Sequence, residues 1–152
     1  MVYKDCDIGS AKPDEKTLKK YPHHLISLKS LDNVFTVSDF CESANKLIIE
    51  AHKNGKLPVL VGGSMMYFKS LFDGIHDLPD RDEVYREELK KLKNNNPEGC
   101  LYKILKDTDP VYANFINKND DMRIIRALEI YKNSHKKMSD ILKEKPTNGA
   151  KH

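Results

Sequence analysis

Two glycines and a serine, Gly62, Gly63 and Ser64, stand between a short apolar run and an apolar helical pattern. The run at residues 58–61 is typical of a buried strand, and residues 65–72 have the spacing of a helix with serine as its N-cap. Free backbone N–H groups and the positive end of a helix dipole would then meet at a strand tip. Such a joint can seat a phosphate or diphosphate, although an ordinary strand-to-helix turn without a ligand gives the same pattern.

Two arginines in the second half of the chain are candidates for contacts with nucleic acid. Arg123 and Arg126 lie three residues apart in a helical pattern, so they would share a face and could bridge phosphates. A solvated helix face gives the same pattern. The net charge of +3 is too small to indicate a nucleic-acid partner, so any RNA binding would need a local basic face.

The residue types that bind metals do not form a ligand set. The three cysteines, Cys6, Cys41 and Cys100, are widely spaced and form no C-x-x-C motif, which favours a reducing cytoplasm. His23 and His24 are adjacent, and on a strand they would point to opposite faces. We therefore predict no protein metal site.

No feature of the sequence predicts membrane insertion or export. No apolar run reaches the roughly 18 residues that a membrane span requires. The N-terminus also lacks the basic and apolar regions of a signal peptide. The predicted location is the cytoplasm, and no membrane partner is expected.

Up to Gly74, the elements that would position Ser64 alternate between strands and helices. We predict strands at residues 23–28 and 58–61, and helices at residues 36–54 and 65–72. Thr36 and Asp39 resemble a capping box at the start of the longer helix. This order favours a parallel sheet, whose ligand sites lie at the carboxyl ends of its strands.

After Gly74 the pattern is helical, with no convincing strand. We predict a charged helix at residues 82–93, a second around residues 101–105 and a third from Asp109–Pro110 to residue 116. A fourth helix is predicted after a cap at residues 119–121, and a short fifth at residues 139–145. The predicted organisation is an α/β core at residues 1–75, a helical unit at residues 76–145 and a disordered tail at residues 146–152.

Four segments, in this order and spacing, resemble the bacterial tRNA dimethylallyltransferase family, also called tRNA isopentenyltransferase. They are VYKDCDIGSAKP at 2–13, HHLI at 23–26, VGGSMMYFKSLFDG at 61–74 and DDMRIIRALEIY at 120–131. Each segment is weak alone, but their ordered co-occurrence is specific and covers nearly the whole chain. The resemblance implies an α/β fold: a partial P-loop-NTPase-like parallel sheet core followed by an all-helical insertion domain.

The resemblance also implies an activity. The family transfers a dimethylallyl group from dimethylallyl diphosphate to N6 of adenosine 37 in tRNA, with Mg²⁺, and its helical insertion grips the anticodon stem-loop. Ser64 matches the family's catalytic Ser/Thr, which lies between the target base and the diphosphate. Gly62 and Gly63 would bind the substrate beside it.

Further site residues follow from the same resemblance. Asp7, Ser10 and Lys12 match the family loop D-I-G-S/T-A-K-P, which lines the reaction channel and would bind substrate. Met1 stands where the family has the Gln of D-S-x-Q. The implied tRNA-binding residues are Met1, Ser64, Arg86, Met122, Arg123, Ile124, Ile125 and Arg126.

Two family motifs are absent from the 152 residues: the phosphate-binding G-x-x-x-x-G-K-S/T and the D-S-x-Q whose Asp is the general base. We therefore expect a central fragment that is inactive alone and that works with missing N- and C-terminal pieces of the same enzyme. A non-catalytic RNA-binding remnant or split subunit remains an alternative. A kinase-like nucleotide binder is disfavoured by the missing P-loop. An incomplete sheet would leave an unpaired edge and favour association.

Overall fold

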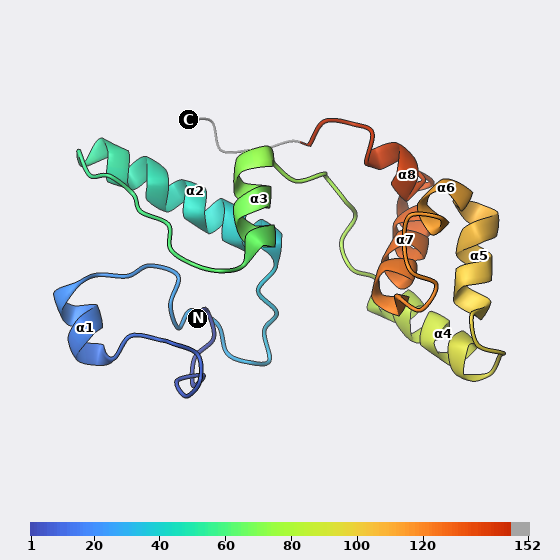
Figure 1. Cartoon of the computed structure of the whole chain (residues 1–152), viewed down its shortest axis with the longest axis horizontal. Helices are drawn as coiled ribbons and strands as arrows, with labels where there is room; N and C mark the ends of the chain where they lie inside the picture. The colour runs from blue at the N-terminus through green and yellow to red at the C-terminus, as the bar shows by residue number, and fades with distance from the viewer. Residues whose placement is uncertain (147–152) are drawn as a thin grey trace. The chain divides into compact units, whose positions relative to one another are not determined.

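The computed structural model of the chain describes residues 1–146, which fall into two compact units (Figure 1). Unit 1 is Met1–Ile75, and unit 2 begins at His76. The division lies next to Gly74, where the sequence pattern changes from alternating to helical. Residues 147–152 of the predicted tail lie outside the described residues.

Unit 1 contains three helices among its described residues: α1 (Glu15–Lys20), α2 (Val37–Lys53) and α3 (Met65–Asp73). The predicted capping box opens α2, where the Thr36 amide donates to Asp39 Oδ2 at 2.8 Å and the Asp39 amide donates to Thr36 Oγ1 at 3.1 Å. The sequence-based helices at residues 36–54 and 65–72 are thereby confirmed. The short α1 was not predicted.

Helices α2 and α3 pack on each other and form the core of unit 1 (Figure 1). Leu71 of α3 is fully buried against Cys41 and Ala44 of α2. The rings of Phe40 and Tyr67 stack with their centroids 4.6 Å apart. The apolar side chains of α2 therefore pack against α3.

The predicted parallel sheet is not present among residues 1–146. An isolated parallel bridge joins Tyr3 and Lys29. The strand predicted at residues 23–28 is a series of bends instead. Leu25 and Ser27 have φ angles of 60° and 53°, in the left-handed region, which interrupts the pleat of a strand.

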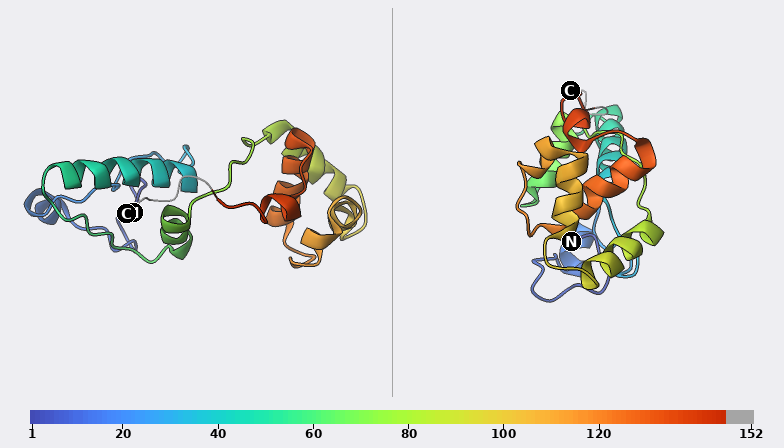
Figure 2. Two further views of the ribbon diagram at one scale, coloured as in Figure 1. Left: turned by 90° about the horizontal axis from the view of Figure 1, so that it is seen from above. Right: turned by 90° about the vertical axis from the view of Figure 1, so that its right-hand side faces the viewer.

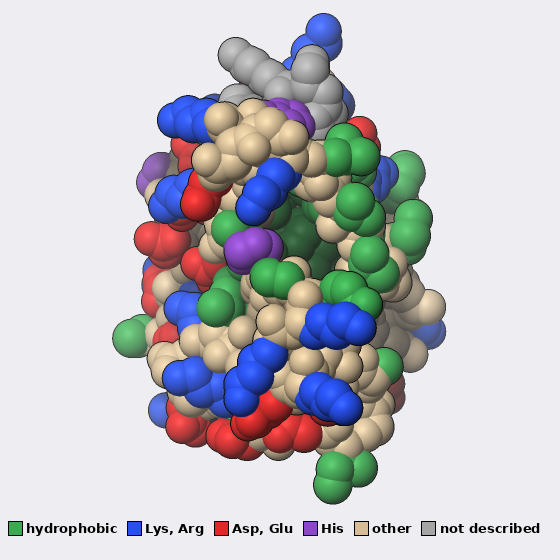
Figure 3. Space-filling model, turned by 90° about the vertical axis from the view of Figure 1, so that its left-hand side faces the viewer, with side chains coloured by type: hydrophobic (Ala, Val, Ile, Leu, Met, Phe, Trp, Pro, Cys, Tyr) green, Lys and Arg blue, Asp and Glu red, His purple; other side chains and the backbone are tan. Residues whose placement is uncertain are grey.

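The second predicted strand, at residues 58–61, also lacks a partner in the described part of the chain. No backbone hydrogen bond joins this segment to any other described residue. The alternate side chains Leu57, Val59 and Val61 are 85%, 75% and 91% exposed, and hydrophobic side chains stand at the surface in the view of Figure 3. A strand forms only by pairing with a neighbour, and residues 1–146 supply none here.

The regular elements in the described part of unit 2 are all helices, as the sequence predicted, and loops connect them (Figure 2). Three helices begin at an aspartate whose carboxylate accepts a hydrogen bond from a first-turn amide. Asp82 accepts from Tyr85, Asp109 from Tyr112 and Asp120 from Arg123. The helices are α4 (Glu83–Asn94), α5 (Cys100–Thr108), α6 (Pro110–Ala113), α7 (Asp121–Ser134) and α8 (Met138–Ile141).

Helix α7 is central to unit 2, where it contacts α4, α5 and α8. Its buried Ile124 and Leu128 belong to one apolar cluster with Leu89 of α4 and Leu105 of α5. Helix α6 connects to α8 through the buried Asp109, whose carboxylate also accepts from the Ser139 amide at 2.8 Å. Within residues 1–146, none of the helices is long and apolar enough to cross a membrane.

Leu71→Ala is expected to lower the free energy of unfolding of unit 1 by about 2–5 kcal/mol. The fully buried leucine loses its apolar contacts, and its removal leaves a cavity in a small core. Hydrogen exchange of the α2 and α3 amides measures this loss. Leu31→Ala, at a position that is 66% exposed, is the control and should leave exchange unchanged. Equal exchange in both variants would contradict the α2–α3 packing.

Candidate functional site

Ser64 lies at the start of α3 as its N-cap residue, and its side chain makes no capping hydrogen bond. Gly62, Gly63 and Ser64 are all exposed. Within the described part of the chain, the amides of Gly63, Ser64 and Met66 donate to no protein acceptor. These N–H groups and the serine hydroxyl are therefore free to bind an anion at the positive end of α3.

Two tyrosine hydroxyls hold the backbone next to α3. The Phe35 amide donates to the Tyr3 hydroxyl at 3.2 Å, and the Tyr67 hydroxyl donates to the Phe35 carbonyl at 3.5 Å. Burial raises the pKa of Tyr67, so its hydroxyl keeps the proton that it donates. The start of α3 is thus tied both to the N-terminal segment and to the entry of α2.

The loop that carries Asp7, Ser10 and Lys12 is bonded within itself. The Lys12 ammonium forms an ion pair with Asp7, and only 10% of the Lys12 side chain is exposed. The Ser10 hydroxyl donates to the Cys6 carbonyl at 2.6 Å. No hydrogen bond or ion pair within residues 1–146 joins this loop to Ser64.

In unit 2, the carboxylate of Glu129 is fully buried and receives four hydrogen bonds. Arg86 donates from Nε at 2.6 Å and from Nη2 at 3.0 Å, the Asp82 amide donates at 2.8 Å, and Arg126 donates from Nη1. Burial alone would raise the pKa of Glu129, but these bonds lower it to about 2. Arg86, Arg126 and Glu129, which we call the arginine cluster, fasten α4 to α7.

The arginine cluster has an excess positive charge, because two guanidinium groups share one carboxylate. Arg126 Nη2 donates a hydrogen bond to the Pro79 carbonyl at 2.8 Å. Arg86 Nη1 donates to no described residue, and none of the buried side-chain polar atoms in the described part lacks a partner. Nη1 is therefore not fully buried, although the Arg86 side chain as a whole is only 11% exposed.

The predicted tRNA-binding segment at residues 122–126 is divided between the surface and the core. Met122 and the Arg123 side chain are 68% and 66% exposed, whereas Ile124 and Ile125 are only 1% and 8% exposed. Arg123 pairs with Asp120 at 3.1 Å, while Arg126 turns to Glu129. The two isoleucines pack in the core of unit 2, and the predicted shared face of the two arginines is split.

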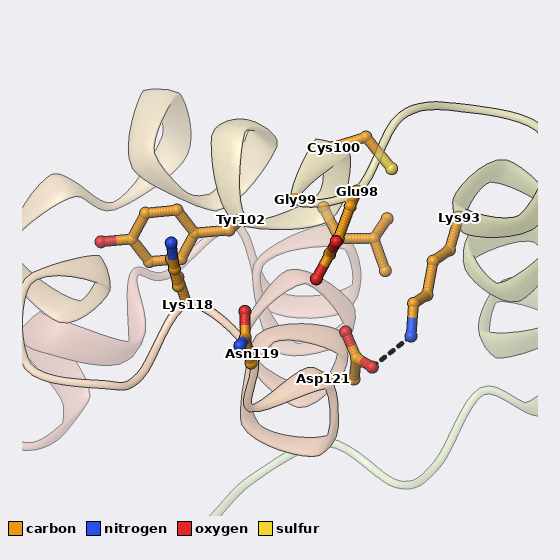
Figure 4. Close-up of a pocket in the computed structure, with 9 residues that line it drawn as sticks. Lys93, Glu98, Gly99, Cys100, Tyr102, Lys118, Asn119 and Asp121 are labelled. Carbon is orange, nitrogen blue, oxygen red and sulfur yellow. Dashed lines mark hydrogen bonds and ion pairs between the residues drawn. The ribbon is translucent and has the colours of Figure 1, made fainter.

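Two further placements complete the predicted set. Met1 is 48% exposed, and its carbonyl accepts a hydrogen bond from the Ser27 amide at 3.1 Å. A small hollow of about 60 Å³ in unit 2 is lined by none of the predicted site residues (Figure 4). It lies between the end of α4, the start of α5 and the loop before α7, and Lys93 pairs with Asp121 at its edge.

The family pattern of IPP transferase matches residues 1–152. The chain belongs to the IPP transferase family. Among its curated relatives, the tRNA dimethylallyltransferase of Vesicomyosocius okutanii subsp. Calyptogena okutanii (strain HA) is 43% identical over 141 residues, which are 93% of this chain and 46% of that protein. The tRNA dimethylallyltransferase of Cupriavidus taiwanensis is 40% identical over 142 residues, covering 93% and 44%.

A solved structure is also similar to this family member. It is a eukaryotic dimethylallyltransferase acting on tRNA, 30% identical, with a TM-score of 0.76 over 95% of this chain and 36% of that chain. The resemblance stated from the sequence motifs is thus confirmed at the level of family. The chain spans about half the length of the curated relatives that it matches.

The described part of this IPP transferase chain contains no group of three or more His, Cys, Asp or Glu side chains that could hold a metal ion.

Sequence reasoning gave no role to Glu129, which the structure places at the centre of the arginine cluster. A signal was available, since Glu129 lies between Leu128 and Ile130 in the apolar pattern of α7 and three residues after Arg126. A carboxylate at a buried helical position requires cationic partners. That requirement would have pointed to arginines that make a structural contact with Glu129.

Glu129→Gln is expected to destabilise unit 2 by about 3–5 kcal/mol at pH 7, because it removes the one carboxylate that balances two partly buried guanidinium groups. The pKa of Glu129 is lowered from 4.5 to about 2, so the wild-type advantage exists above pH 4.5 and is lost as the pH falls through 2. Urea unfolding of both proteins across this range measures the difference.

Glu87→Gln is the matched control, because Glu87 pairs with Lys90 on the exposed face of α4. This variant should unfold like the wild type at every pH. A Glu129→Gln protein whose deficit stays constant down to pH 2 would contradict the ionised, buried state of Glu129.

Proposed function

We propose that this chain acts in tRNA prenylation, as part of an enzyme that transfers a dimethylallyl group from dimethylallyl diphosphate to N6 of adenosine 37. The observation that carries the proposal is the family match over residues 1–152, joined by relatives named tRNA dimethylallyltransferase. The geometry of both units supports it with one anion-binding feature in each.

In unit 1, the proposed role is to hold the diphosphate. The free amides of Gly63, Ser64 and Met66 can donate to phosphoryl oxygens, and the Ser64 hydroxyl adds a further donor. Negative charge grows on the diphosphate as it leaves the dimethylallyl carbon. Donors fixed at the start of α3 would stabilise that charge in the transition state.

The loop with Asp7, Ser10 and Lys12 has a supporting role in this proposal. Lys12 is balanced by Asp7 in the absence of substrate. A diphosphate would compete with Asp7 for the ammonium, which could then add one positive charge to the site. Such an exchange of partners requires the loop to approach Ser64 when substrate is bound.

In unit 2, the proposed role is to bind the anticodon stem-loop. The partly exposed guanidinium groups of Arg86 and Arg126, 11% and 28% exposed, offer a basic surface whose side-chain geometry Glu129 fixes in advance. Fixing these long side chains lowers the entropy lost when a phosphate binds. Met122 and Arg123 are exposed on α7 and extend the contact, while Ile124 and Ile125 support it from the core.

The parallel sheet enters here as part of the proposal. The extended segment with Leu57, Val59 and Val61 presents free backbone groups and alternating apolar side chains. We propose that strands from the remaining N- and C-terminal parts of the enzyme pair with it and complete a P-loop-NTPase-like core. Pairing would remove the exposed apolar surface and satisfy the backbone.

Mg²⁺ and a cytoplasmic location also belong to the proposal. Mg²⁺ commonly binds through substrate phosphates and few protein carboxylates, which agrees with the lack of an acidic cluster in residues 1–146. When bound, it would neutralise charge on the diphosphate. Transfer RNA and dimethylallyl diphosphate are both intracellular substrates.

Incubation of the chain with dimethylallyl diphosphate and unmodified tRNA should give little prenyl transfer. The family's general base lies in the motif D-S-x-Q, which the 152 residues lack, and loss of such a base costs about 10²–10⁴-fold in rate. Transfer of radiolabelled dimethylallyl groups to tRNA measures the rate. Rapid turnover by this chain would refute the assignment of the base.

Adding separately produced N- and C-terminal pieces of a related enzyme should restore transfer, and Ser64→Ala should then reduce the restored rate by about 10²–10³-fold. Ser70→Ala, in the same helix, is the control and should keep the rate. A Ser64→Ala rate equal to that of the control would remove Ser64 from the reaction.

Binding without transfer would favour the alternative that the chain is an RNA-binding subunit. The chain should bind an anticodon stem-loop RNA with an affinity that falls as salt rises, because arginine–phosphate contacts release counterions. Arg86→Ala should weaken binding and flatten the salt dependence by about 0.7–0.9 in slope per lost phosphate contact. Fluorescence anisotropy at several salt concentrations tests this, and salt-insensitive binding would count against it.

A further inference from the structure

Phe115, in the loop between α6 and α7, is the most exposed large aromatic side chain in the described residues. It is 89% exposed, more than any other large apolar side chain in the described part of unit 2. Its neighbour Ile116 packs against the core of unit 2. Because successive side chains of the loop point in different directions, anchoring Ile116 inward presents the ring of Phe115 to solvent.

The loop holds this ring on a well-bonded backbone. The Phe115 amide donates to the Tyr112 carbonyl at 2.9 Å. Asn117 accepts from the Asn119 amide through its side chain and from the Asp120 amide through its carbonyl, both at 2.9 Å. The exposed position of Phe115 is therefore a fixed feature of the fold, with little ordering left to lose when a ligand binds.

The charges around the loop leave one cation free. Asp120 pairs with Arg123, and Asp121 pairs with Lys93 (Figure 4). Lys118 has no ion pair or hydrogen bond with any described residue. Asp120 and Asp121 are thus each paired, while the Lys118 ammonium, three residues from the exposed ring, has no ion-pair partner among the described residues.

Neutral polar and apolar groups complete the surface. The side chains of Asn117, Asn119 and Met122 line one open hollow together with Asp120 and Asp121, the two carboxylates paired with Arg123 and Lys93, and Met122 is 68% exposed. Amide side chains can donate to and accept from the edges of nucleobases, and a thioether can lie against a base face. The name base platform is used below for Phe115, Asn117, Lys118, Asn119 and Met122.

We propose that the base platform binds an unpaired RNA nucleotide, with its base stacked on Phe115 and its phosphate next to Lys118. Aromatic rings bind single-stranded bases by stacking, which requires no particular sequence, and the unpaired ammonium matches a phosphate. This inference rests on the proposed RNA binding by unit 2 and adds a contact outside the residues assigned from the family motifs. It names the unstacked loop of the RNA as the part recognised.

The test uses the full chain, fluorescein-labelled oligoadenylate as the single-stranded probe, an RNA duplex of the same length and the anticodon stem-loop. Phe115→Ala should weaken binding of oligoadenylate and of the stem-loop by roughly 5- to 100-fold and leave duplex binding unchanged. Phe115→Tyr should bind within about twofold of the wild type, because a ring is retained. Phe115→Leu should bind as weakly as Phe115→Ala.

Two variants serve as controls. Leu142→Ala changes an exposed apolar residue at the end of α8 and should bind all probes like the wild type. Lys118→Ala should lower the salt dependence of oligoadenylate binding by about 0.7 in slope, the loss of one single-strand phosphate contact. Because Phe115 and Lys118 are exposed, their variants should melt at the wild-type temperature.

Each outcome decides the question. Binding of the stem-loop by wild type and Phe115→Ala with equal affinity would overturn the base platform and leave the proposed RNA binding through Arg86 intact. Full binding by Phe115→Leu would replace stacking with plain apolar contact and overturn it too. Sedimentation showing RNA-free self-association that Phe115→Ala abolishes would make the surface a protein interface. Failure of the wild type to bind any RNA would remove both proposals.

Discussion

The bond network of Glu129 is the interaction on which the helical unit depends. One fully buried carboxylate joins Arg86 of α4, Arg126 of α7 and the backbone at Asp82. A buried charge is tolerated only when its partners are in place, so the network permits one relative arrangement of these helices. The same network holds both guanidinium groups in one geometry, with the Arg86 side chain 11% exposed and the Arg126 side chain 28% exposed.

The elements with local signals were predictable from the sequence. The capping box of α2, the Asp–Pro start of α6 and the aspartate caps of α4 and α7 are each encoded within four residues. A run such as residues 58–61 differs, because its structure depends on a strand that must come from elsewhere in the fold. The apolar residues of this run predict that it is buried, but they do not identify the strand that would pair with it.

The candidate site was predictable in type and less so in geometry. Motif order indicated Ser64 and the arginines, and the structure leaves the Ser64 hydroxyl and adjacent amides free of protein partners. Spacing alone suggested that Arg123 and Arg126 act together, yet each follows a different carboxylate, Asp120 or Glu129. Side-chain direction in a helix depends on tertiary partners, which a three-residue spacing does not specify.

The two apolar clusters share no residue: the one around Leu71 lies within unit 1, and the one around Leu105 lies within unit 2. Natural variation in one core therefore leaves the packing of the other untouched. A genetic crossover near residue 76 would exchange a whole helical module without disturbing either interior. Lineages could in this way exchange the helical unit while the segment around Ser64 evolves under separate selection.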